Sequence, residues 1–243
     1  MRPSPHDIAL AHVLVKTERA KKHLLDLEAL SRNSIKGIAF SRDSKGQLRY
    51  PPEPSLTVSV HVIGAAGDVI HNLRSALDHL AWELAKWSTG APKKPRKCCF
   101  PIGWSLDNYK EIKKSGAVAG MSPEAKKLID GLNPYKGGNP ALWRIHYLDI
   151  VDKHHHLLFA GYRIQFSDTG LPGNVGIVND EPTYFVGLFD DDFQGENQSP
   201  FQPAPPEFEA SDVKPLIPAL HELLVFTEDL IKNFRPLLTL RKS

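Results

Sequence analysis

Residues 64–88 carry the longest continuous helical pattern in the sequence, with apolar positions spaced three and four residues apart. Successive residues of a helix are rotated by about 100°, which places these positions on one stripe. The stripe comprises Ala66, Val69, Ile70, Leu73, Leu77, Leu80 and Leu84. The pattern predicts one long helix with a buried apolar face, and the other elements are placed relative to it.

Three other segments repeat this periodicity, at residues 5–32, 140–158 and 211–235, and a shorter helix is expected over residues 122–129. In the first segment, the expected apolar contacts are Ile8, Val13, Leu14, Leu24, Leu27 and Leu30. In the segment 140–158, the expected apolar face consists of Trp143, Tyr147, Ile150, His154 and Leu158. Four long amphipathic helices are enough to form a bundle around a shared core.

Alternation with a period of two replaces the helical pattern in residues 35–62 and 159–193, where turn-forming residues separate the apolar runs. The alternating residues before the central helix are Leu56, Val58, Val60 and Val62. We therefore expect an α+β fold, in which antiparallel β-strands are inserted into the helical bundle before its second helix and between its third and fourth. The whole chain, residues 1–243, is expected to form a single domain.

The composition is that of an ordinary globular protein, with 41% hydrophobic and 24% charged residues. The formal net charge of +2 gives no overall basic field, so binding to nucleic acid or anionic lipid would need a local patch. The two cysteines, Cys98 and Cys99, are adjacent and predict no disulfide. Because no apolar run is long enough for a membrane span and the N-terminus has no signal-peptide pattern, we expect a cytoplasmic protein that does not enter a membrane.

Polar side chains gather beside the apolar stripe of the central helix. Arg74 and Asp78 lie at its margin with His71 next to them, while Asn72 and His79 lie further round the helix. An arginine and an aspartate four residues apart on a helix are placed to form an ion pair. A guanidinium can also bind phosphate through paired donors, and an imidazole titrates near neutral pH. These residues are therefore candidates for a structural network and for a catalytic site.

The sequence Arg74-Ser-Ala-Leu-Asp-His79 resembles the motif of the HEPN ribonucleases, helical proteins that cleave RNA without a metal ion. The resemblance implies that Arg74 holds the scissile phosphate and that His79 assists proton transfer at the ribose 2′-hydroxyl, with Asp78 and His71 beside them. This sequence has Ser75 after the arginine, where the family usually has an amide, an acid or a histidine. One helix offers a single Arg-His pair, so we expect a homodimer in which two copies line a cleft.

A second resemblance covers more of the chain. The landmarks HNLRSALDHLAW, FPI and DKH are similar, in their order, to those of a group of uncharacterised bacterial proteins. This similarity implies a cytoplasmic bacterial protein and supplies no activity.

The helix predicted over residues 140–158 carries the remaining candidates. The candidate substrate-binding residues are Asn72, Asp149, Lys153 and His154. The candidate metal ligands are His71, His156 and Asp149, because imidazole and carboxylate groups from two helices can complete a metal site. Charged groups beside an apolar face are costly unless they find partners. We therefore predict that this helix packs beside the central one and brings its polar residues near Arg74 and Asp78.

Three functions remain open at this point. The first is a HEPN-like, metal-independent ribonuclease or an RNA-binding helical bundle. The second is a non-catalytic interaction or scaffold protein, in which Arg74, Asp78 and His71 stabilise helix contacts. The third is a metal-dependent hydrolase that uses histidines of two helices. No P-loop, dinucleotide fingerprint or Gly-x-Ser-x-Gly elbow occurs in the sequence, so we expect no cofactor.

Overall fold

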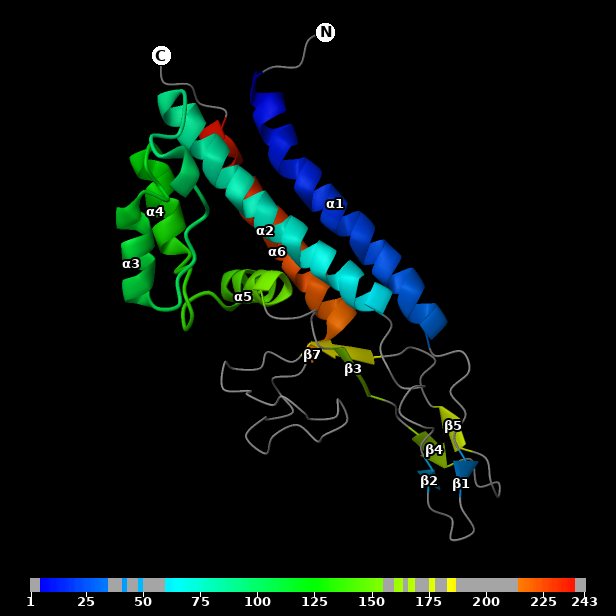
Figure 1. Ribbon diagram of the computed structural model, residues 1–243. Helices are drawn as coiled ribbons and strands as arrows, with labels where there is room; N and C mark the ends of the chain where they lie inside the picture. Colours follow the sequence, from blue (N-terminus) through cyan, green and yellow to red (C-terminus); the bar gives the residue numbers. More distant parts are fainter. Residues whose placement is uncertain are drawn as a thin grey trace.

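Three long helices form the body of the protein in the computed structural model (Figure 1). They are α1 (Pro5–Ser34), α2 (Val60–Thr89) and α6 (Leu216–Phe234). Helix α1 runs antiparallel to α2, and α6 runs parallel to α2, so α1 begins and α6 ends at the same end of the bundle. The structure describes residues 5–34, 41–42, 48–49, 60–154, 160–163, 166–168, 175–177, 183–186 and 214–238, with side chains in 8–31, 60–153 and 216–238.

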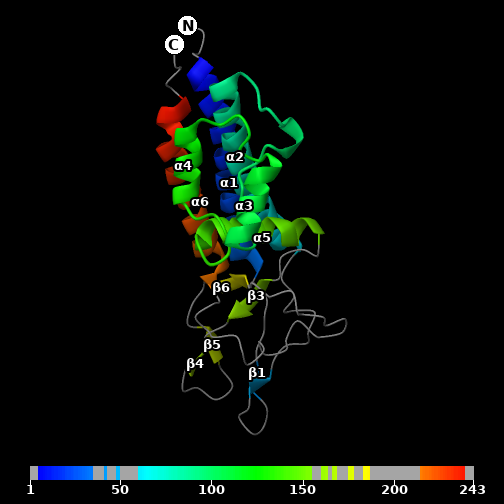
Figure 2. The same ribbon diagram turned by 90° about the vertical axis from the view of Figure 1, so that its left-hand side faces the viewer.

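Three shorter α-helices, which follow one another along the chain, lie on one side of α2 (Figures 1 and 2). They are α3 (Leu106–Ser115), α4 (Pro123–Gly131) and α5 (Pro140–His154), and two short 3₁₀ helices, η2 (Pro95–Lys97) and η3 (Arg235–Leu238), complete the described helical elements. Side-chain caps start α3 and α4, because the Ser105 and Ser122 hydroxyls accept hydrogen bonds from backbone N–H groups in their first turns. Helix α5 lies crosswise to the long helices in both views.

The apolar stripe of α2 is the centre of the core. All of its predicted members, from Ala66 to Leu84, are buried. They pack with buried residues of the other two long helices, which are Val13, Ala20, Leu24 and Leu27 of α1 and Leu220, Leu223, Ile231 and Phe234 of α6. Two expected contacts of α1 are wrong, because Ile8 and Leu14 are exposed. None of the described helices combines the length and the apolar composition that a bilayer span requires.

The predicted α+β class is wrong, and the protein is helical. The residues with described side chains are about 80% helical, with six α-helices and no β-strand among them. Strands outside those ranges are two to four residues long and pair as β1–β2, β4–β5 and β3–β6–β7. Their bounds are Ser41–Arg42 (β1), Leu48–Arg49 (β2), Ala160–Arg163 (β3), Phe166–Asp168 (β4), Val175–Ile177 (β5), Thr183–Val186 (β6) and Lys214–Pro215 (β7). Such short antiparallel ladders do not supply a sheet layer, which needs several longer strands with a shared apolar face.

Two local predictions fail for related reasons. Val60 and Val62 were expected in a strand but lie in the first turn of α2, because burial of Val62 outweighs the small helical penalty of a β-branched residue. In α5 the buried apolar positions are Leu142, Ile145 and Leu148, next to the expected Trp143–Tyr147 face. The Trp143 and Tyr147 rings of that face are half-buried and pack against Trp104. Most of residues 35–62 and 159–193 lies outside the described residues.

Candidate functional site

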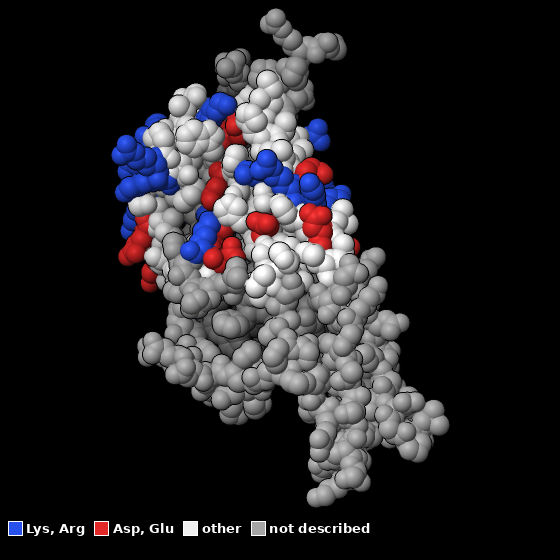
Figure 3. Space-filling model, turned by 45° about the vertical axis from the view of Figure 1, so that its right-hand side comes forward, with Lys and Arg blue, Asp and Glu red and all other residues white. Residues whose placement is uncertain are grey.

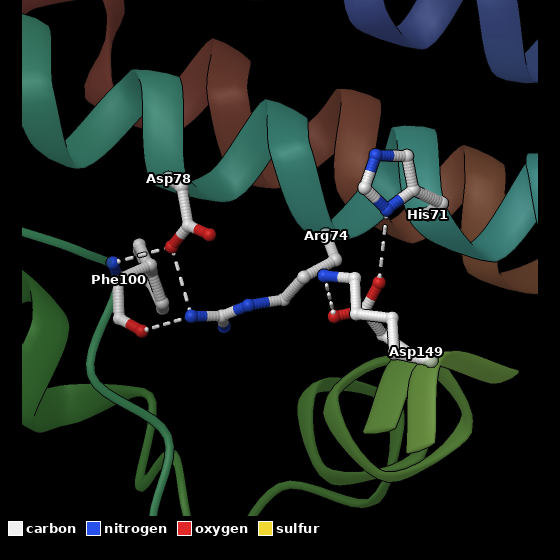
Figure 4. A network of polar contacts seen from close by, with 6 residues as sticks. His71, Arg74, Asp78, Phe100 and Asp149 are labelled. Atoms are coloured by element: carbon white, nitrogen blue, oxygen red, sulfur yellow. Dashed lines mark hydrogen bonds and ion pairs between the residues drawn. The ribbon is translucent and has the colours of Figure 1, made fainter. Parts of the chain in front are cut away.

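Helix α2 presents its polar side chains in two directions. His71, Arg74 and Asp78 are three and four residues apart, so they follow one side of the helix, which faces α5 and the segment around Phe100 (Figure 4). His79 is one residue further on and therefore points about 100° away, toward α1. The side chains of the Arg-x4-His motif thus belong to two different surroundings.

Arg74 is held in a closed network of hydrogen bonds. Its side chain is only 9% exposed, and Nη2 donates to Oδ1 of Asp78 at 2.8 Å and to the backbone oxygen of Phe100 at 2.9 Å. The backbone N–H of Phe100 donates to the same Oδ1 at 2.9 Å. The network ties the middle of α2 to the segment that follows η2, so Arg74 joins two parts of the fold.

One terminal nitrogen of Arg74 is left over. Within the described part of the chain, Nη1 is a buried side-chain atom with no hydrogen-bond partner. A buried N–H group without a partner costs free energy, and a buried guanidinium left unsatisfied costs more than a neutral group. Arg74 is therefore stabilised mainly through Nη2 and the Asp78 carboxylate.

A second network connects α2 to α5. Nδ1 of His71 donates to Oδ1 of Asp149 at 3.2 Å, and Nζ of Lys153 donates to Oδ2 at 2.7 Å. The Asp149 side chain is 6% exposed, so this carboxylate is buried with a partner on each oxygen. Close packing brings the helices together, since a Cβ on Gly67 would lie 2.3 Å from Oδ1 of Asp152. The two helices are in contact as predicted, but α5 crosses α2, and Asp149 pairs with His71, not with Arg74 or Asp78.

Beside this contact, α5 carries a perturbed histidine and an aromatic cluster. Burial, together with the positive charge of Arg74, lowers the pKa of His146 to about 4, so the ring is neutral at neutral pH. Trp143 lies 6.0 Å from the His146 ring and 4.8 Å from the ring of Trp104, measured between centroids. Tyr147 packs edge-on to Trp104 at 6.0 Å. Trp104 is exposed, and the other three rings of the cluster are partly buried.

On the side of α2 that carries His79, a pocket of about 470 Å³ lies between α2 and α1. Its lining residues are His12, Val15, Asp78, His79, Trp82, Glu83 and Cys98. Inside it, Nδ1 of His12 donates to Oε1 of Glu83 at 3.2 Å. The Glu83 side chain is only 4% exposed, so a buried carboxylate fixes the orientation of an exposed imidazole. Lys86 lies 3.5 Å from the second oxygen of this carboxylate.

Other titratable groups of the pocket are perturbed in different directions. Burial, followed by the charge of Lys16, lowers the pKa of His79, which favours the neutral ring. Burial raises the pKa of Asp78 against the opposing effect of Arg74. Burial, with the neighbouring Cys99, raises the pKa of Cys98 to about 11, so this thiol stays protonated and is a poor nucleophile. The pocket therefore offers two imidazoles for proton transfer rather than a thiolate.

The structure groups the sequence candidates differently from the prediction. Arg74 and Asp78 are together, and His71 is joined to Asp149 and Lys153. His79 lies in the pocket, whose lining does not include Arg74. The Asn72 amide is buried and donates to the backbone oxygen of Asp68 at 2.8 Å, so this candidate substrate ligand is engaged in its own helix.

The described side chains do not support the predicted metal site. Among residues with described side chains, no cluster of three His, Cys, Asp or Glu residues could hold a metal ion. The side chains of His154 and His156 lie outside the described residues.

His12 and Glu83 were not selected from the sequence. Glu83 follows Leu80 by three residues and precedes Leu84 by one, which places an acid at the edge of the apolar stripe. A carboxylate in that position needs a partner, and this was the available signal. No comparable signal marks His12, which is separated from Glu83 by 71 positions.

Comparison of the chain with protein-family models, with curated proteins and with solved structures gave no match.

Proposed function

We propose that the protein is a metal-independent ribonuclease whose acid–base pair is His79 and His12 in the pocket between α1 and α2. The observation that carries this proposal is the presence of two imidazoles on one pocket in different electrostatic surroundings. Pairs of titratable groups with different surroundings are the usual arrangement for general acid–base catalysis. The Arg-x4-His resemblance directs the proposal to RNA.

In the proposed reaction, neutral His79 accepts the proton of a ribose 2′-hydroxyl while the 2′-oxygen attacks the adjacent phosphorus. The bond from phosphorus to the 5′-oxygen breaks, and protonated His12 donates its proton to this leaving group. The products are a 2′,3′-cyclic phosphate and a 5′-hydroxyl. Glu83 orients the His12 ring and compensates its positive charge, as a buried carboxylate does for a catalytic imidazole.

The role of Arg74 is revised in this proposal. Its Nη2 donates to Asp78 and Phe100, and the guanidinium does not line the pocket. We assign it as a positioning residue, which holds Asp78 and the segment leading to Cys98 in the pocket wall. Lys16 of α1 is the cation whose charge acts on His79.

The test is cleavage of a single-stranded RNA in excess chelator. His79→Ala and His12→Ala are each expected to lower the rate by about 10²- to 10⁴-fold, the range for loss of a general acid or base. His221→Ala is the matched control, because His221 forms a similar pair with Glu28 at 2.7 Å outside the pocket. Activity that persists in the double variant, or that disappears in chelator, would overturn the proposal.

A non-catalytic interaction protein is the second candidate, and a specific observation favours it. Val15 and Trp82 are exposed apolar residues at the same pocket. Aromatic side chains of this kind are enriched in protein interfaces, and a second copy of the chain is the proposed partner. Light scattering of wild-type protein and Trp82→Ala tests this: a dimer that the variant loses supports it, and a monomer at all concentrations contradicts it.

A further inference from the structure

The connection between α2 and α3 has an unusual charge distribution. No acidic residue occurs between Glu83 and Asp107, whereas this stretch contains five lysine or arginine residues. Four of them fall in residues 93–97, which we call the basic segment, and all four are exposed. Elsewhere the face in Figure 3 shows basic and acidic side chains close together over much of its described surface. The basic segment is therefore a local positive patch on a chain with little net charge.

The basic segment is ordered by its own contacts. The buried Pro92 precedes it, and within it η2 places the backbone N–H of Lys97 3.0 Å from the oxygen of Lys94. Lys94 packs against Gly116, where a Cβ would lie 2.4 Å from the lysine Cδ, and its Nζ donates to the oxygen of Ser115 at 3.3 Å. The segment lies apart from the three long helices, at the upper right of Figure 2, and borders a hollow of about 380 Å³.

The basic segment leads directly to the proposed active site. Cys98, which follows Lys97 in the chain, lines the pocket that contains His79. The next residues reach Phe100, whose backbone is fixed by Arg74 and Asp78. A chain of phosphates lying along the basic segment would therefore reach the pocket without crossing an acidic residue of this connection.

We propose that the basic segment binds the phosphate backbone of single-stranded RNA and directs the strand into the pocket. This inference rests on the proposed function and adds to it the place where the substrate enters. Exposed lysine and arginine side chains bind phosphates without reading the sequence, so the site selects a polyanion rather than a particular base. Lys93, Arg96 and Lys97 make the contacts, while Lys94 keeps its packing on α3.

Binding is measured by fluorescence anisotropy with a labelled 2′-O-methyl oligonucleotide of about 12 nucleotides, a length within the usual single-strand site size. This probe lacks the 2′-hydroxyl nucleophile and cannot be cleaved. The triple variant Lys93→Gln/Arg96→Gln/Lys97→Gln is expected to bind at least about tenfold more weakly in low salt. Its slope of log K against log salt should be about 2 units shallower, since each lost single-strand phosphate contact contributes about 0.7.

The matched control is Lys21→Gln/Lys22→Gln/Lys127→Gln, which removes the same charge from exposed lysines outside the segment. Equal weakening in both triple variants, or an unchanged slope in the first, overturns the inference. The inference is also overturned if the triple variant weakens binding of an acidic peptide or of anionic vesicles but not binding of the oligonucleotide. Segment-dependent binding with no cleavage of the matching RNA by wild-type protein refutes the proposed function alone. Cleavage with an unchanged slope refutes only the entry site.

Discussion

Removal of Arg74 tests whether this residue is structural. Arg74→Ala deletes both Nη2 hydrogen bonds, so the Phe100 carbonyl loses this donor and Asp78 loses the cation that offsets its burial. Breaking a buried ion pair costs about 3–5 kcal/mol. Asp78 is 37% exposed and partly screened by water, so we expect a smaller loss of about 2–3 kcal/mol. For a chain of this size that corresponds to a fall in melting temperature of about 6–9 °C.

Asp78→Ala should cost a similar amount, because it leaves the Arg74 charge buried without its carboxylate. The double variant should be less destabilised than the sum of the two, by about 1–2 kcal/mol, since each single change already breaks the same contact. Lys110→Ala is the matched control: its pair with Asp107 is exposed, and we expect less than about 0.5 kcal/mol. Calorimetry or thermal circular dichroism measures all four. A melting temperature that stays unchanged or rises in Arg74→Ala would refute the structural role and favour a role of this arginine in substrate binding.

Three other substitutions test the packing and titration of the fold, each by urea unfolding. Gly67→Ala should be at least about 1 kcal/mol less stable than Gly64→Ala, because only the first meets a carboxylate of α5; equal stabilities would contradict this close contact. Since the folded state disfavours charge on His146, stability should fall between about pH 6.5 and about pH 4, by up to about 3 kcal/mol, and His146→Gln should reduce that fall. Tyr109→Phe loses a 2.5 Å hydrogen bond to an aspartate and should cost about 1 kcal/mol, whereas Tyr135→Phe, with a 3.5 Å contact, should cost less than half of that.

The helices that could be recognised from the sequence are those with enough periodic apolar residues. Residues 64–88 are one example, and the capped segment beginning at Ser122 is another. Helix α3 was not recognised, because Tyr109 is the one buried residue of its ten and its charged residues give no stripe. The available signals were the cap at Ser105 and the glycine at position 116. They mark the two ends of the helix, but no periodic apolar pattern connects them.

The strand prediction at Val60 and Val62 failed because alternation describes one chain segment, while a sheet depends on neighbours. Val60 and Val62 fit a strand pattern and also fit the first turn of a helix whose core side is buried. Only the packing of α1 and α6 on α2 shows which pattern prevails, since burial contributes more than intrinsic propensity. The same reason explains α5, where periodicity identified a face but the crossing direction of the helix selected the adjacent one.

The sequence by itself determined which residues share a side of each long helix, because the rotation per residue is a property of the helix alone. It therefore placed Arg74 with Asp78 and placed His79 further round the helix. The tertiary structure alone decided what each side meets. Arg74 meets the backbone of Phe100, and His79 shares a pocket with His12, because α1 returns antiparallel along α2 and brings positions 71 residues apart within hydrogen-bond distance. Such contacts depend on the direction and packing of whole helices, which no local spacing encodes.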